Sequence, residues 1–140
     1  MSDDPFDLAR FVDAQRPVWE TVAGELRAGS KQTHWMWFVF PQLATLGRSS
    51  MARHYGLSGL EEARAYLAHP VLGSRLRSSC ELLLRLEQRS ARDIFGAVDA
   101  KKLRSCLTLF DAAARGEVFG QCLQRYFEGE RDPLRVDQVR

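Results

Sequence analysis

The sequence lacks any long hydrophobic run and any recognisable leader. Its longest apolar stretch, WMWFVFP at residues 35–41, is far shorter than the roughly 20 residues that a membrane-spanning helix needs. The first residues, MSDDPFDLARF, begin with acidic side chains and lack the cationic run and apolar core of a signal peptide. We therefore expect a soluble protein without membrane contact, located in the cytoplasm.

Cysteine and histidine are scarce, with three residues of each type. The cysteines are Cys80, Cys106 and Cys122, and the histidines are His34, His54 and His69. No two cysteines form a C-x-x-C pair, and each lies in an apolar helical stretch, which is typical of packing groups in a reducing compartment. No two histidines have the i, i+4 spacing of a helical metal site. The sequence predicts no metal site and no cofactor.

Charge of one sign is also lacking, because 20 basic and 18 acidic residues leave a formal net charge of +2. Domains that bind duplexes carry a stronger basic excess, concentrated in a stripe. We therefore expect no nucleic-acid partner. A glycine-rich phosphate loop, a carboxylate pair and a serine–histidine–aspartate signature are absent as well. No motif names a reaction, and no catalytic residue is assigned.

What the sequence does contain is helical periodicity over most of its 140 residues. Apolar residues spaced by three and four predict helices over residues 6–15, 18–28, 59–68, 71–89, 100–115 and 117–128. The length and the 45% hydrophobic content are ordinary for one folded domain. We expect a compact, single all-α domain over residues 1–140, with about six helices and an ordered core at about residues 5–135.

Capping signals mark several of the predicted helix ends. Asp4 followed by Pro5 is typical of a helix start, and Gly29 is typical of a helix end. The further predicted caps are two capping boxes, Ser58 with Glu61 and Ser90 with Asp93, and Asp99 as a single cap. The Ser90–Asp93 box is predicted to open a short turn that ends at Gly96. Beyond Gly129 we expect one packed turn at residues 133–134 and then a frayed end.

Residues 30–55 lack periodicity and hold the densest aromatic run, WMWFVF at residues 35–40. We predict short helical turns and ordered loop here, with Ser49 or Ser50 capping one turn. Rings this dense cannot all face one core, because neighbouring side chains diverge in any regular conformation. Two interpretations stay open. The segment is a buried hub between helices, or one or two of its rings line a small-molecule pocket.

Polar residues around the aromatic run are the candidates for chemistry. A lysine and an arginine on either side of it can hold an anionic group while the rings stack on a flat moiety. His34 is a candidate acid or base, and Lys102 lies three residues before Ser105 on one face of a predicted helix. The candidate ligand-binding residues are Lys31, His34, Trp35, Trp37, Gln42, Arg48, Ser49, Lys102 and Ser105.

Four stretches closely resemble a bacterial family of unknown function. They are RFVDAQ (10–15), ELRAGSKQTHWMWFVFPQLATLGRSS (25–50), EARAYLAHPVLGSRL (62–76) and KLRSCLTLF (102–110). The family is the domain-of-unknown-function family numbered 1810, whose members are often mislabelled calpastatin. The resemblance covers about residues 5–135 and implies a compact, mainly α-helical fold without implying an activity. Members often read KLRSSMTLF, and the Cys106-Leu107 found here suggests a buried position.

A fainter similarity links the chain to NADAR domains, which are associated with ADP-ribose and riboflavin-intermediate chemistry. The matching residues are Glu62, Ala63, Arg64, Lys102 and Phe110. This similarity implies an N-glycosidase-like or nucleotide-binding pocket.

Three functional hypotheses follow from the sequence. The first is a pocket for an anionic or nucleotide-like molecule beside residues 34–40, including hydrolysis of an N-glycosidic bond. The second is a non-catalytic helical interaction module whose aromatic segment docks a partner or a second copy. The third is a fold in which these residues serve the core alone. The oligomeric state is left open.

Overall fold

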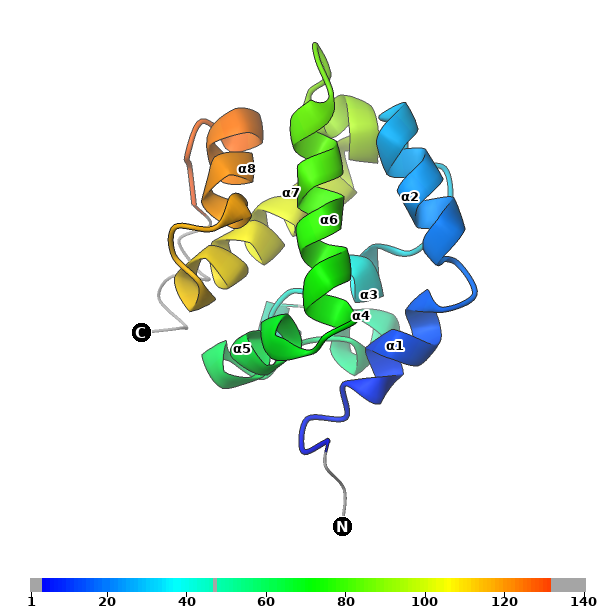
Figure 1. The fold of residues 1–140 in the computed structure, drawn as a ribbon, viewed down its shortest axis with the longest axis vertical. Coiled ribbons are helices and arrows are strands. Elements are labelled where there is room, and N and C mark those ends of the chain that lie inside the picture. Colours follow the sequence, from blue (N-terminus) through cyan, green and yellow to red (C-terminus); the bar gives the residue numbers. More distant parts are fainter. Residues whose placement is uncertain (1–3, 47, 132–140) are drawn as a thin grey trace.

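The computed structural model describes residues 4–46 and 48–131, and eight α-helices lie within these ranges (Figure 1). They are α1 (Ala9–Gln15), α2 (Trp19–Ala28), α3 (Met36–Val39), α4 (Ser50–His54), α5 (Leu60–Ala68), α6 (Leu72–Arg85), α7 (Ala91–Ala113) and α8 (Val118–Phe127), with a 3₁₀ turn, η1 (Ala44–Leu46), before α4. No strand forms among the described residues. The predicted all-α class is confirmed, and the six longer helices match the six predicted ones.

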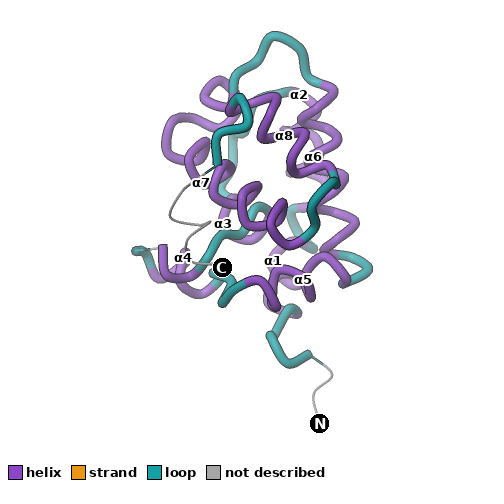
Figure 2. Tube along the Cα trace, turned by 90° about the vertical axis from the view of Figure 1, so that its left-hand side faces the viewer, coloured by secondary structure: helices purple, strands orange, loops and turns teal. Residues whose placement is uncertain are grey.

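Helix α6 runs through the middle of the molecule (Figure 1) and contacts α2, α5 and α8, while α7 packs against α5 and α8. Helices α1, α4 and α5 gather at one end of the molecule, and α2 lies toward the other (Figure 2). The inner face of α6 carries Leu72, Leu76, Cys80 and Leu83, each no more than 1% exposed. Cys106 on α7 is also fully buried, as the comparison with the family pattern suggested. These residues form one hydrophobic core with the aromatic segment.

Residues 43–57 form a loop that extends from the helical bundle, and the two ends of this loop lie side by side. Leu43 and Leu57 form an isolated parallel bridge, in which the Ala44 N–H donates to the Leu57 carbonyl at 2.9 Å. The two backbones come so close that a Cβ on Gly56 would lie 2.3 Å from the Ala44 Cα. This close approach explains the glycine. The loop carries η1 and α4 and is closed at its base.

Helix α7 is longer than predicted. Its start is the predicted capping box, because the Asp93 N–H donates to Ser90 Oγ and the Ser90 N–H donates to Asp93 Oδ2, each at 3.0 Å. Gly96 has φ 82° and ψ 166°, which are not helical values, so α7 consists of two helical segments that meet at a kink at this residue. The first segment ends at Gly96, as predicted, because glycine tolerates a positive φ. Asp99 therefore lies inside α7, and its prediction as an N-cap is wrong.

The capping box predicted from Ser58 and Glu61 does not form, because the N-cap of α5 is Gly59 and no side chain caps it. Ser58 donates from both its backbone N–H and its hydroxyl to Glu62 Oε1, each at 2.9 Å, whereas Glu61 is exposed. Glu62 also accepts from Arg10 Nη2 at 2.9 Å and is 3% exposed. The helix begins at Leu60, so Glu62 and not Glu61 faces the core.

The remaining helix ends agree in part with the sequence. Gly29 ends α2 in the left-handed conformation, with φ 71°, and Asp4 accepts two backbone N–H groups ahead of α1. Helix α6 ends at Arg85 rather than at the predicted Arg89, because Leu86 is extended. The turn predicted at residues 133–134 and the frayed end lie outside the described residues.

Candidate functional site

The aromatic segment enters the core through the short helix α3. The loop before it is fixed where the Lys31 N–H donates to the Ile94 carbonyl of α7 at 2.8 Å. Within α3, Met36 and Phe38 are buried, whereas Trp37 is half-buried. The segment is therefore mainly a core hub that reaches the surface through Trp37.

Trp35 belongs entirely to that hub. It is 1% exposed, and its ring centroid lies 6.2 Å from that of Phe40 and 6.4 Å from that of Phe95. A buried indole N–H needs an acceptor, and Trp35 Nε1 donates to Glu25 Oε1 at 2.9 Å. Trp35 is therefore a core residue, and its ring is enclosed by other side chains of the core.

Glu25 ties the loop before α3 to α2. Its carboxylate accepts from the Gln32 N–H at 2.8 Å, the Thr33 N–H at 3.1 Å and the Thr33 hydroxyl at 2.7 Å, in addition to Trp35. Partial burial by itself raises the pKa of Glu25, but the hydrogen bonds outweigh it and lower the pKa to about 2. Glu25 was missed from sequence, although the acceptor that a buried tryptophan requires was a usable signal.

Two lysines from distant segments share one carboxylate. Lys31 Nζ lies 3.0 Å from Asp99 Oδ2, and Lys102 Nζ lies 3.3 Å from Asp99 Oδ1. Lys31 Nζ also donates to the Thr33 carbonyl at 2.7 Å. Asp99, predicted as a cap, therefore joins the predicted candidates Lys31 and Lys102. The cluster carries two cations for one anion.

Each of these lysines also faces an indole ring. Lys31 Nζ lies 5.1 Å from the centroid of Trp35, and Lys102 Nζ lies 5.4 Å from the centroid of Trp37. Both distances are within the range of cation–π attraction. The Lys31 side chain is 8% exposed and that of Lys102 is 26% exposed. Solvent therefore reaches the Lys102–Trp37 side of the cluster more readily.

Gln42 lies against the same side, where a small cavity separates α3 from the loop of residues 43–57. Its volume is about 10 Å³, which is near the minimum that one water molecule requires. The lining residues are Met36, Trp37, Phe40, Gln42, Ala52, Tyr55 and Lys102. Five of the predicted candidates, including Gln42, thus belong to one neighbourhood, and its cavity is too small for more than about one water molecule.

The other predicted candidates lie apart from this cluster's contacts. His34 and Arg48 are exposed. Ser49 caps α4, as predicted, by accepting from the Ala52 N–H at 3.0 Å. Ser105 is 4% exposed, and its hydroxyl donates at 3.1 Å to a carbonyl one turn earlier in α7. The contact of Ser49 is that of a helix cap.

Comparison with known proteins places the chain among its relatives. The family model described as "Protein of unknown function (DUF1810)" matches residues 5–139. The chain belongs to this family. The chain is also similar to a solved structure, that of the conserved hypothetical protein Rv1873 from Mycobacterium tuberculosis, with 50% identity and a TM-score of 0.95. The match covers 97% of this chain and 98% of that one.

Membership of DUF1810 confirms the family resemblance noted in the sequence. The similarity to NADAR domains is not shown by these comparisons, and no curated protein matches the chain. The bacterial relative agrees with the bacterial character of the family. Within the described residues of this DUF1810 chain, no helix is long and apolar enough to cross a membrane.

Proposed function

We propose that the protein binds a small anionic molecule with a flat ring, of the nucleotide class, on the outer side of the aromatic segment. The observation that supports this proposal is the convergence of Lys31 and Lys102 on Asp99 beside two indole rings. A cation next to an aromatic face can hold a phosphate or carboxylate while the ring stacks. Phosphate-bearing ring compounds match both features.

The two lysines have different roles in this proposal. Lys31 is engaged by the Thr33 carbonyl, by Asp99 and by the Trp35 ring, so it holds Asp99 in place. Lys102 is more exposed and receives the anionic group. Trp37 provides the stacking face, and the Gln42 amide, which can both donate and accept, lies next to it.

The size of the neighbouring cavity determines where the ligand lies. A volume of about 10 Å³ excludes a nucleotide ring, so the ring rests on the half-buried face of Trp37. Deeper entry requires outward movement of Ala52 and Tyr55, which are carried by the loop of residues 43–57. Docking of a protein through both tryptophans is less well supported, because Trp35 is enclosed.

Hydrolysis of an N-glycosidic bond is the catalytic form of this proposal. In that reaction water adds to the anomeric carbon, the C–N bond breaks and the leaving base acquires a proton. A carboxylate stabilises the positive charge that develops on the sugar. Asp99 supplies a carboxylate within the cluster, whereas Glu25 already accepts four hydrogen bonds.

Thermal unfolding in the presence of AMP, ADP-ribose, ribose 5-phosphate and inorganic phosphate tests the proposal. A ligand at a hundredfold excess over its Kd stabilises the native state by about 2.7 kcal/mol, which is easily measured. Lys102→Ala is expected to weaken binding by roughly tenfold or more, as loss of one charge-assisted contact does. Lys101→Ala, which removes the neighbouring exposed lysine, is the matched control.

Two results would contradict the proposal. The first is an unchanged unfolding temperature with every compound in the panel. The second is equal weakening by Lys101→Ala and Lys102→Ala, since only general electrostatic attraction would explain it. Release of free base from ADP-ribose or AMP, followed by chromatography, tests turnover separately.

A further inference from the structure

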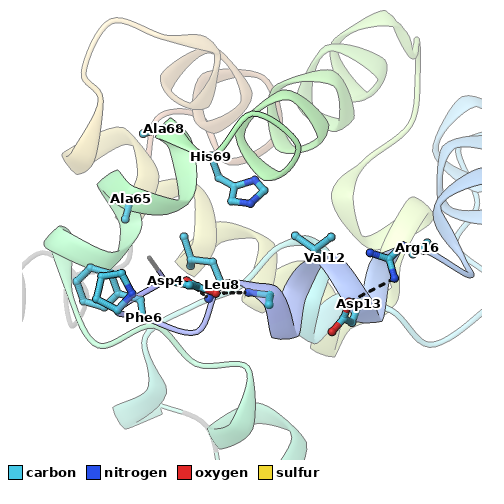
Figure 3. A pocket seen from close by; sticks show the side chains of 11 residues that line it. Asp4, Phe6, Leu8, Val12, Asp13, Arg16, Ala65, Ala68 and His69 are labelled. Atoms are coloured by element: carbon cyan, nitrogen blue, oxygen red, sulfur yellow. Dashed lines mark hydrogen bonds and ion pairs between the residues drawn. The ribbon is translucent and has the colours of Figure 1, made fainter. Parts of the chain in front are cut away.

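A much larger cavity lies between α1 and α5. It is a groove of about 610 Å³ between α1, α5 and the start of α6 (Figure 3), a volume typical of small-molecule sites. Its walls are mainly apolar. The apolar lining residues are Pro5, Phe6, Leu8, Ala9, Val12, Ala65 and Ala68, and the polar ones are Asp4, Asp13, Arg16 and His69.

His69 presents one directed hydrogen-bond donor to this groove. Its Nδ1 accepts from the Val71 N–H at 3.1 Å and the Leu72 N–H at 3.3 Å, at the start of α6. In the neutral ring these two bonds require the proton to be on Nε2. Figure 3 shows the imidazole projecting from the junction of α5 and α6 into the space above Leu8. The outer N–H of His69 is therefore available to a molecule in the groove.

The charges along the groove disfavour an anionic occupant. Asp4 accepts from the Ala9 and Leu8 N–H groups, and these bonds hold its pKa below the ordinary value, so it remains ionised at neutral pH. At the other end, Asp13 and Arg16 form an exposed pair with an N–O distance of 3.4 Å. An anion would meet the carboxylates of Asp4 and Asp13, and Arg16, the arginine that lines the groove, is already paired with Asp13.

We propose that this groove binds an uncharged molecule with an apolar body and one carbonyl acceptor, such as a medium-chain amide or ketone. The carbonyl accepts from His69 Nε2, and the apolar body covers Leu8, Val12 and Ala65. This site is separate from the lysine–tryptophan cluster and takes a ligand of a different class. Neither site depends on the other.

Nuclear magnetic resonance titration of the isotope-labelled protein with octanamide tests this inference. Saturable shifts are expected at the backbone N–H groups of Ala65, Val71 and Leu72, and at the His69 ring. Octanoate, which has the same chain and a negative charge, is expected to bind at least tenfold more weakly because of Asp4 and Asp13.

Three variants separate the groove from general surface binding. Ala68→Phe fills the groove and is expected to abolish the octanamide shifts, whereas Ala97→Phe, at another exposed helical alanine, leaves them unchanged. His69→Asn keeps an oxygen that can accept from the two backbone N–H groups but is too short to donate into the groove. It is expected to weaken binding roughly three- to tenfold, as loss of one hydrogen bond does, with an unchanged unfolding temperature.

Several outcomes would overturn the inference. Absence of saturable shifts with millimolar octanamide rules out a site of this kind. Equal binding of octanoate and octanamide shows that the ligand class is wrong. Binding that survives Ala68→Phe, or that Ala97→Phe weakens equally, places the ligand elsewhere on the surface.

Discussion

At the scale of single residues, Glu25 and Lys31 are held by partners within the structure, whereas Lys102 stays accessible to solvent. Glu25 accepts four donors from one short loop, and Lys31 is almost enclosed by its partners. Lys102 contacts the same aspartate as Lys31 and is three times as exposed, at 26% against 8%. The difference in exposure separates a residue that stabilises the site from one that can meet a ligand.

Replacing Glu25 tests the first of these roles. Because the pKa of Glu25 is about 2 in the folded state and about 4.3 in an unfolded chain, its charge stabilises the fold above about pH 4.3. This contribution is lost as the pH falls from about 4.3 to 2. Glu25→Gln is expected to lower the free energy of unfolding at pH 7 by about 1–3 kcal/mol and to flatten its decrease over that acidic interval.

Urea unfolding at several pH values measures both effects. Glu87→Gln, at an exposed position outside the helices, is the control and should follow the wild type. If Glu25→Gln keeps the full acidic decrease of the wild type, the hydrogen bonds of Glu25 do not account for it.

Among the elements, α7 consists of two helical segments that meet at a kink at Gly96. Gly96 lies at φ 82° and ψ 166°, and a Cβ placed on it meets no atom within 4 Å. Any cost of a side chain there is therefore backbone strain alone. The kink sets the direction of the second half of α7, which carries Asp99 and Lys102.

Gly96→Ala is expected to lower the free energy of unfolding by about 1–3 kcal/mol, because a side chain disfavours this conformation. Gly24→Ala is the matched control, since its Cβ also meets nothing within 4 Å but the residue lies inside α2 without a positive φ. That change is expected to be neutral or to stabilise by up to about 1 kcal/mol. Thermal unfolding of both variants is the measurement, and equal effects would contradict the strain at Gly96.

At the scale of the whole molecule, the three cysteine thiols are enclosed in the hydrophobic core. Cys80, Cys106 and Cys122 are all fully buried. The pKa of Cys80 is raised by its hydrogen bond with Cys122 and by burial, and that of Cys106 is raised by burial. Because all three thiols are buried away from the reagent, we expect none of them to react with Ellman's reagent in the native state. All three should become reactive together in urea, at the midpoint of fluorescence unfolding, and a thiol that reacts earlier would reveal local opening.

The fold could be predicted from sequence because its signals are local. Helical periodicity and caps such as Gly29 and the Ser90–Asp93 box depend on neighbours within one or two turns, and the structure agrees with them. The start of α5 is an exception with a tertiary cause. Two acidic residues, Glu61 and Glu62, follow Ser58, and packing against the core selects Glu62.

The candidate site could be predicted only in part, because its contacts join distant segments. Lys31, Trp37 and Lys102 were selected by residue type, but their convergence on Asp99 depends on how α7 packs against the loop before α3. His69 was not among the candidate residues. Its Nδ1 accepts from the start of α6, and the groove in front of it arises from the separation of α1 and α5, which periodicity does not reveal.

The bridge between Leu43 and Leu57 has a consequence for how this chain can change in length. Because the two ends of the loop are held together by backbone hydrogen bonds, the loop can become longer without displacing the helices of the bundle. Each doubling of a flexible loop costs only about 0.6 kcal/mol in closure entropy. Insertions at its outer, exposed part would therefore be inexpensive in stability, and they would reshape the rim above Trp37 while leaving the helices as they are.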